Sequence, residues 1–97
     1  MSANAARGEA AICGHVLRPT FAALVAAEEE LGPLFALVER AAAGQLKLSE
    51  MVALFWHCLA DRTAVLRTDL GDAVTAAGLA AATPALRTLL GQILQGR

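Results

Sequence analysis

Residues 49–61 read Ser-Glu-Met-Val-Ala-Leu-Phe-Trp-His-Cys-Leu-Ala-Asp, and this stretch decides the fold. At 3.6 residues per turn, its apolar side chains form two adjacent stripes along a helix. The stripes consist of Met51, Leu54, Phe55 and Cys58, and of Val52, Trp56 and Leu59. Ser49 suits the N-cap, and Glu50 suits the positive end of the helix dipole. Because a helix that is apolar over so much of its circumference is normally buried, we expect a central helix at about 50–61.

Two shorter helices are predicted before this central helix. Thr20 is a good N-cap for the first, at about 21–31, and Gly32 with Pro33 ends it. Its inner face is predicted to carry Phe21, Leu24, Val25 and Leu31. The second helix, at about 33–43, ends at Gly44. Its inner stripe is predicted to be Leu34, Leu37, Val38 and Ala41.

The two ends of the chain complete the expected fold. Short apolar segments on either side of Gly14-His15 predict a small β-hairpin with its turn at those two residues. After a loop at 62–70, we expect a short helix at about 71–77 and a last helix at about 80–95. Pro84 is tolerated there only if it lies in the first turn. The fold class expected is mostly α, a compact bundle of four to five short helices preceded by a small N-terminal β-hairpin.

Length and composition limit the possible functions. The chain has 97 residues, which predicts one domain at 7–97 after a disordered segment at 1–6. Its net charge is −1 with no tyrosine and no basic run, which argues against nucleic-acid binding. The apolar stretches are too short or too interrupted to span a membrane. With no apolar signal segment, and with Cys13 and Cys58 read as free thiols, we expect a cytoplasmic protein.

The apolar content favours a partner. The strong core formers are the leucines together with Phe21, Phe35, Phe55, Val25, Val38, Val52, Val74 and Ile93. They are enough for one compact core, and they exceed what a monomer of this size readily hides. Surplus apolar surface of this kind favours binding to another protein or self-association as a homo-oligomer.

Motifs that carry catalysis are missing from the sequence. It contains no glycine-rich dinucleotide motif, P-loop, HExxH or GxSxG. His57 and Cys58 are adjacent, but neighbours on a helix point about 100° apart and do not face each other. We therefore expect no enzyme activity, no catalytic residue, no cofactor, no metal and no small-molecule substrate.

Glu28 and Trp56 are the two residues that carry a functional hypothesis. Helical periodicity places Glu28 on the inward stripe, where a carboxylate needs a partner such as Arg18, Arg40 or Arg62. It is then either half of a salt bridge at the rim or a buried contact that shapes a partner surface, while Glu29 and Glu30 are expected to be solvated. Trp56 is either a core residue or an interface anchor. The candidate partner-binding residues are Trp56, Val52, Leu59, Glu28, Leu90 and Leu94.

Several segments together carry a family resemblance. They are Arg7-Gly-Glu9, Leu17-Arg-Pro-Thr-Phe-Ala-Ala-Leu24, Glu28-Glu-Glu-Leu-Gly32, Leu34-Phe-Ala-Leu-Val38, Gly44-Gln-Leu46, Leu54-Phe-Trp-His-Cys-Leu59, Ala76-Ala-Gly-Leu79 and Leu89-Leu-Gly-Gln-Ile-Leu94. With these segments the chain resembles the tail chaperone family of gene transfer agents and phages. The resemblance implies a chaperone that binds the tape measure protein, helps recruit the major tail protein to the growing tube, and leaves before the particle is finished. The segment 10–16 is shorter than the family's usual strands, so partner binding is least expected on the hairpin. A small helical adaptor or regulatory interaction domain is the alternative.

Overall fold

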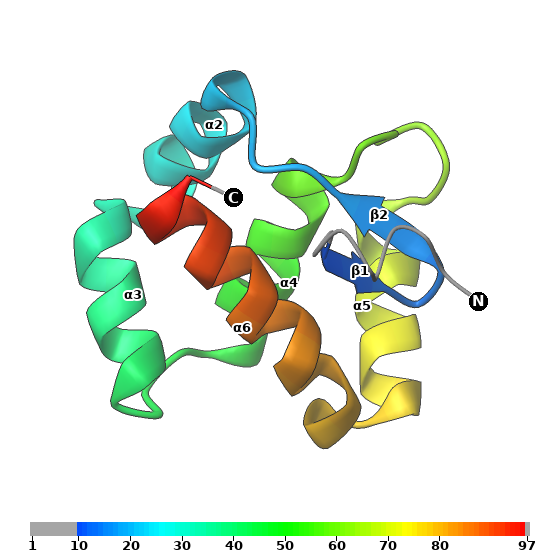
Figure 1. Cartoon of the computed structure of the whole chain (residues 1–97). Helices are drawn as coiled ribbons and strands as arrows, with labels where there is room; N and C mark the ends of the chain where they lie inside the picture. Colours follow the sequence, from blue (N-terminus) through cyan, green and yellow to red (C-terminus); the bar gives the residue numbers. More distant parts are fainter. Residues whose placement is uncertain (1–9, 97) are drawn as a thin grey trace.

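The computed structural model describes residues 10–96, and the expected disordered segment at 1–6 lies outside them. Five helices follow a two-stranded antiparallel hairpin (Figure 1). The elements are β1 (Ala10–Ile12), β2 (His15–Leu17), α2 (Phe21–Leu31), α3 (Leu34–Ala42), α4 (Leu48–Cys58), α5 (Arg67–Ala77) and α6 (Leu79–Gln95). The mostly helical fold class with a small N-terminal hairpin is confirmed.

Helix α4 lies at the centre of the fold, as its two apolar stripes predict. Residues 51–55 and Cys58 are all buried, and α2 and α5 both pack against this helix (Figure 1). The largest fully buried side chains come from almost every element. They are Phe55, Leu17, Leu37, Leu54, Leu70, Leu89, Val74 and Cys58. One continuous core therefore joins the hairpin to the helices.

The hairpin is fastened to the end of α4. Ala10 pairs with Leu17 and Ile12 pairs with His15, so the turn is Cys13-Gly14 and not the predicted Gly14-His15. Both turn residues have positive φ angles, 50° and 83°, as a tight two-residue hairpin turn requires. The other edge of β2 meets the chain after α4, where the amide of Ala60 donates to the carbonyl of Val16 at 2.9 Å. This pairing leaves β2 without a free edge.

Two helices begin earlier than the sequence predicts. Helix α4 starts at Leu48, so Ser49 lies inside it; the backbone amide of Lys47 is capped by the carboxylate of Glu50 at 3.0 Å. The carboxylate of the third helical residue thus satisfies the backbone amide of the N-cap residue, as in a capping box. Helix α5 starts at Arg67, so the second half of the expected loop is helical. Tertiary packing of Leu70 in the core supplies the stability that local signals did not reveal.

Pro84 lies in the second turn of α6, and not in the first as expected. A proline there leaves the carbonyl of Ala80 without its helical partner. Both residues are exposed, so water can satisfy that carbonyl. No single helix within residues 10–96 is long and apolar enough to cross a membrane; α5 and α6 meet that test only together, and they are bent by 117° at Gly78.

Helix α2 is rotated relative to the prediction, although its limits are as expected. Ala23 and Ala27 are its buried residues, while the side chains of Phe21, Val25 and Glu28 point outward. The physical reason is the close packing of α2 on α4, since small side chains let two helix axes approach. The prediction of an inward Phe21, Val25 and Glu28 was therefore wrong.

Candidate functional site

A shallow hollow of about 220 Å³ opens where α2, α3 and the end of α6 meet. Its lining is apolar apart from one carboxylate. The lining residues are Leu24, Glu28, Leu34, Phe35, Val38, Ile93 and Leu94. Small-molecule pockets usually have volumes of roughly 300–1,000 Å³, so the hollow better suits one or two side chains of another protein.

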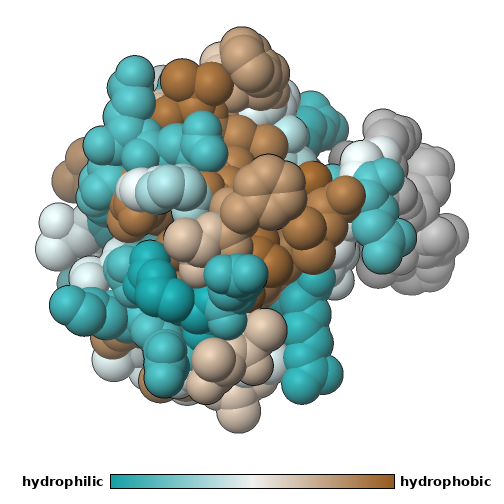
Figure 2. All heavy atoms as spheres, turned by 90° about the vertical axis from the view of Figure 1, so that its left-hand side faces the viewer, coloured by the Kyte–Doolittle hydropathy of each residue, from teal (hydrophilic) through white to brown (hydrophobic). Residues whose placement is uncertain are grey.

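Exposed aromatic and aliphatic side chains extend this hollow. Phe35 is 80% exposed, Phe21 is 84% exposed, and Val25 is also exposed. Phe21, Val25 and Glu28 follow one another at i, i+4 and i+7 on α2, which places them on one side of that helix. We call the hollow together with Phe21 and Val25 the apolar face. Figure 2 views this side of the molecule and shows one brown area bordered by teal groups.

Glu28 shapes this face by holding α3 against α2. Its Oε2 accepts a hydrogen bond from the backbone amide of Leu34 at 3.0 Å. Leu34 is the first residue of α3, and the N-cap Pro33 has no side chain that can accept that bond. The carboxylate of Glu28 therefore acts as a cap from the preceding helix. Both expected roles of Glu28, a salt bridge at the rim and a buried contact that shapes a partner surface, are corrected, because Glu28 is exposed and accepts its hydrogen bond from a backbone amide.

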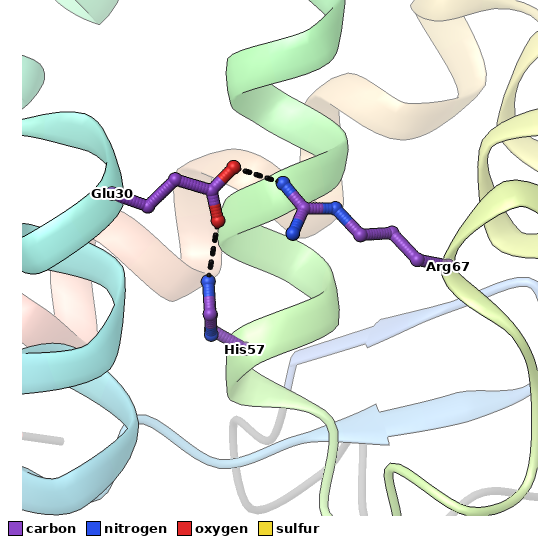
Figure 3. A network of polar contacts seen from close by, with 3 residues as sticks. All are labelled: Glu30, His57 and Arg67. Atoms are coloured by element: carbon purple, nitrogen blue, oxygen red, sulfur yellow. Dashed lines mark hydrogen bonds and ion pairs between the residues drawn. The ribbon is translucent and has the colours of Figure 1, made fainter.

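Glu30 is the carboxylate that joins three helices, although it was expected to be solvated. Its Oε1 accepts a hydrogen bond from Nε2 of His57 on α4 at 2.8 Å, and its Oε2 accepts one from Arg67 on α5 (Figure 3). The hydrogen bond from Arg67, followed by that from His57, lowers the pKa of Glu30 from 4.5 to about 2. A polar network of Glu30, His57 and Arg67 therefore links α2, α4 and α5.

Trp56 lies beside that network and is half-buried. The guanidinium carbons of Arg62 and Arg67 are each 5.7 Å from the centre of its indole, a cation–π distance. The ring of His57 meets it edge-on, with centroids 5.3 Å apart. Within the chain, Trp56 is therefore already covered by two cations. Its role as an interface anchor stays a prediction.

The thiol–imidazole pair has no catalytic geometry. Cys58 is buried in the core, and burial raises the pKa of its thiol to about 12, so the thiolate needed for attack is disfavoured. Nε2 of His57 is engaged by Glu30. Among residues 10–96, no group of three or more His, Cys, Asp and Glu side chains is placed to hold a metal ion.

Comparison with known proteins assigns a family. Residues 8–96 match the family described as "Phage tail tube protein, GTA-gp10". The chain belongs to this family. No curated protein and no solved structure matches it significantly. The match covers nearly the whole chain and supports a role in the tails of phages or gene transfer agents.

The structure brings two of the candidate partner-binding residues of this GTA-gp10 family member together. Glu28 and Leu94 both line the hollow, and Leu90 is half-buried one turn before Leu94 on α6. Val52 and Leu59 are buried in the core, so neither side chain is presented to a partner. Trp56 lies elsewhere, beside Arg62 and Arg67.

Sequence reasoning missed Phe21 and Phe35, which it assigned to the core. A signal for Phe21 does exist in α2. Phe21 and Val25 are spaced four residues apart, and so are Ala23 and Ala27, so the helix has two alternative stripes. Hydrophobicity alone selects the larger residues for the core, whereas close helix packing selects the alanines.

Proposed function

We propose that this chain is a tail assembly chaperone of a gene transfer agent or prophage. In this proposal it binds the tape measure protein in the cytoplasm and helps recruit tail-tube subunits while the tail is built. The observation that carries the proposal is the apolar face, which the fold leaves open around Phe21 and Phe35. Membership in a tail protein family supplies the biological setting.

Phe21 and Phe35 both expose an aromatic ring to water. An exposed phenylalanine gives the monomer little stability, because its apolar surface stays hydrated. Two such residues beside one hollow are typical of a surface that is covered part of the time by another protein. The hairpin cannot supply that surface through β2, whose two edges are both paired.

A second candidate follows from the family's description, which names a tail tube protein. A structural subunit stays in the finished tail, whereas an assembly chaperone leaves it. The two functions therefore differ in one measurable quantity, the number of copies of this chain in the mature particle.

The test combines co-expression with particle analysis. Co-expression with the neighbouring tail genes is expected to give a complex that contains the tape measure protein, and mass spectrometry of purified particles is expected to find no copies of this chain. Many copies in the particle would establish the structural subunit instead. A complex that contains only a protein unrelated to tails would favour the adaptor and contradict both tail functions.

A further inference from the structure

We propose that the apolar face binds an amphipathic helix whose polar side carries lysine and arginine. This inference rests on the proposed function and names the chemistry of the segment that the partner would supply. Three properties of the face support such an occupant: the backbone of its walls, the charges at its rim, and the repulsion that those charges would cause against a second copy of this chain.

The backbone of the walls requires a helical occupant. All three walls are helices, whose amides and carbonyls are mostly bonded within α2, α3 and α6. They offer no strand edge with which an extended segment could pair, and the paired edges of β2 lie on the other side of α4 (Figure 1). A segment placed in an apolar groove must then satisfy its own backbone hydrogen bonds, which a helix does.

The charges around the face are acidic. Helices α2 and α3 carry five charged residues, and two of them have ion-pair partners: Glu30 is paired with Arg67, and Arg40 is paired with Glu50 at 2.7 Å. The other three are Glu28, Glu29 and Glu39, and none of them has an ion-pair partner among residues 10–96. Glu39 follows Phe35 by one turn, and Glu28 lines the hollow. Helix α6 carries one charged residue, Arg87, which is two turns before Leu94 and does not line the hollow. A basic partner complements this rim.

The same charges argue against a second copy as the occupant. A symmetric dimer through this face would place its carboxylates opposite one another, because such an interface pairs one patch with itself. Like charges brought together at an interface oppose association. A helix with basic residues beside its apolar stripe meets the same rim with opposite charge.

The probe for this proposal is a pair of synthetic peptides of about 18 residues, long enough to form a helix on binding. Both carry leucines at i, i+3, i+4 and i+7, and the polar positions hold lysine in one peptide and glutamate in the other. By calorimetry, the lysine peptide is expected to bind at least about tenfold more tightly than the glutamate peptide. Raising the salt from about 0.05 M to about 0.5 M is expected to narrow that difference.

Variants locate the binding on the face. Phe35→Ala is expected to weaken binding of the lysine peptide about tenfold or more. Leu66→Ala is the matched control, because Leu66 is 72% exposed but lies at the start of α5, away from the apolar face. This variant is expected to bind the lysine peptide as tightly as the wild type does. The double variant Glu29→Lys/Glu39→Lys is expected to reverse the preference toward the glutamate peptide. Glu28 is kept in that variant because it caps α3.

Several results would overturn the proposal. Equal binding of the two peptides would show that charge does not select the occupant. Peptide binding that Phe35→Ala leaves intact would show that the site is not this face. A dimer in sedimentation that Phe35→Ala dissociates would identify a second copy as the occupant. If the tape measure protein co-purifies equally with wild type and Phe35→Ala, the chaperone function stands and this site fails. If the lysine peptide binds selectively but no tail protein co-purifies, this site stands and the chaperone function fails.

Discussion

The two sides of α2 differ in how their side chains are used. Towards α4 and α5, Ala23 and Ala27 are buried, and Glu30 binds His57 on α4 and Arg67 on α5. Towards α3 and α6, Phe21 and Val25 stand in solvent beside a hollow. Two large apolar residues are thus exposed, while the two buried residues of the helix are alanines. The difference teaches that buried packing uses one side of this helix, while the proposed function would use the other side for contact with a partner.

Replacing a phenylalanine by alanine in the core and on the apolar face gives the largest expected contrast in stability. Phe55→Ala removes a fully buried ring from α4 and is expected to cost about 3–5 kcal/mol of the free energy of unfolding. Phe35→Ala removes an exposed ring and is expected to change stability by no more than about 0.5 kcal/mol. Urea unfolding followed by circular dichroism measures both. Comparable losses would mean that Phe35 is a core residue after all; Phe55→Leu provides a folded variant if Phe55→Ala does not fold.

Removing the cap on α3 is expected to give the second-largest loss of stability. Glu28→Ala deletes the acceptor for the amide of Leu34 and is expected to cost about 1 kcal/mol, as the loss of a helix cap does. Glu28→Gln keeps an oxygen that can accept the same bond, so its loss is expected to be smaller. Thermal unfolding of the two variants checks this ordering. An unchanged midpoint for Glu28→Ala would show that Glu28 is simply solvated.

The contact of α2 with α4 and α5 is expected to respond to acid through Glu30. Its pKa in the folded chain is about 2, below the ordinary 4.5, so its contribution to stability is complete above pH 4.5 and is lost as the pH falls towards 2. Because Glu30 is partly exposed, that contribution is expected to be at most about 1 kcal/mol. The difference in unfolding free energy between wild type and Glu30→Gln should shrink over this acid range. A difference that stays constant with pH would contradict the role of the network.

The central helix and the limits of α2 could be predicted from the sequence. Residues 51–59 are apolar on two adjacent stripes, so α4 is buried whichever stripe faces inward. Helix α2 is bounded by an N-cap threonine and by Gly32-Pro33, and its observed limits are the predicted ones. Local chemistry is sufficient where each signal acts within a few residues of its effect.

The candidate site could not be predicted from the same signals. The rotation of α2 depends on how closely it packs against α4, which periodicity does not report. The apolar face also departs from the rule that large apolar residues are buried. The partners of Glu30 are 27 and 37 residues away in the sequence, so no local pattern indicates them. The polar residue that was singled out, Glu28, is functional in a different way, as the cap that positions α3.

The tight turn of the hairpin has a practical consequence for chemistry on this molecule. It exposes Cys13 at the tip, while Cys58 is buried with its thiol protonated. The unmodified chain therefore offers a single attachment point for maleimide or other thiol reagents under native conditions. Figure 1 places the hairpin on the opposite side of the molecule from α3. A fluorophore or affinity tag conjugated there leaves the apolar face clear, so binding can be followed on wild-type protein without an engineered handle.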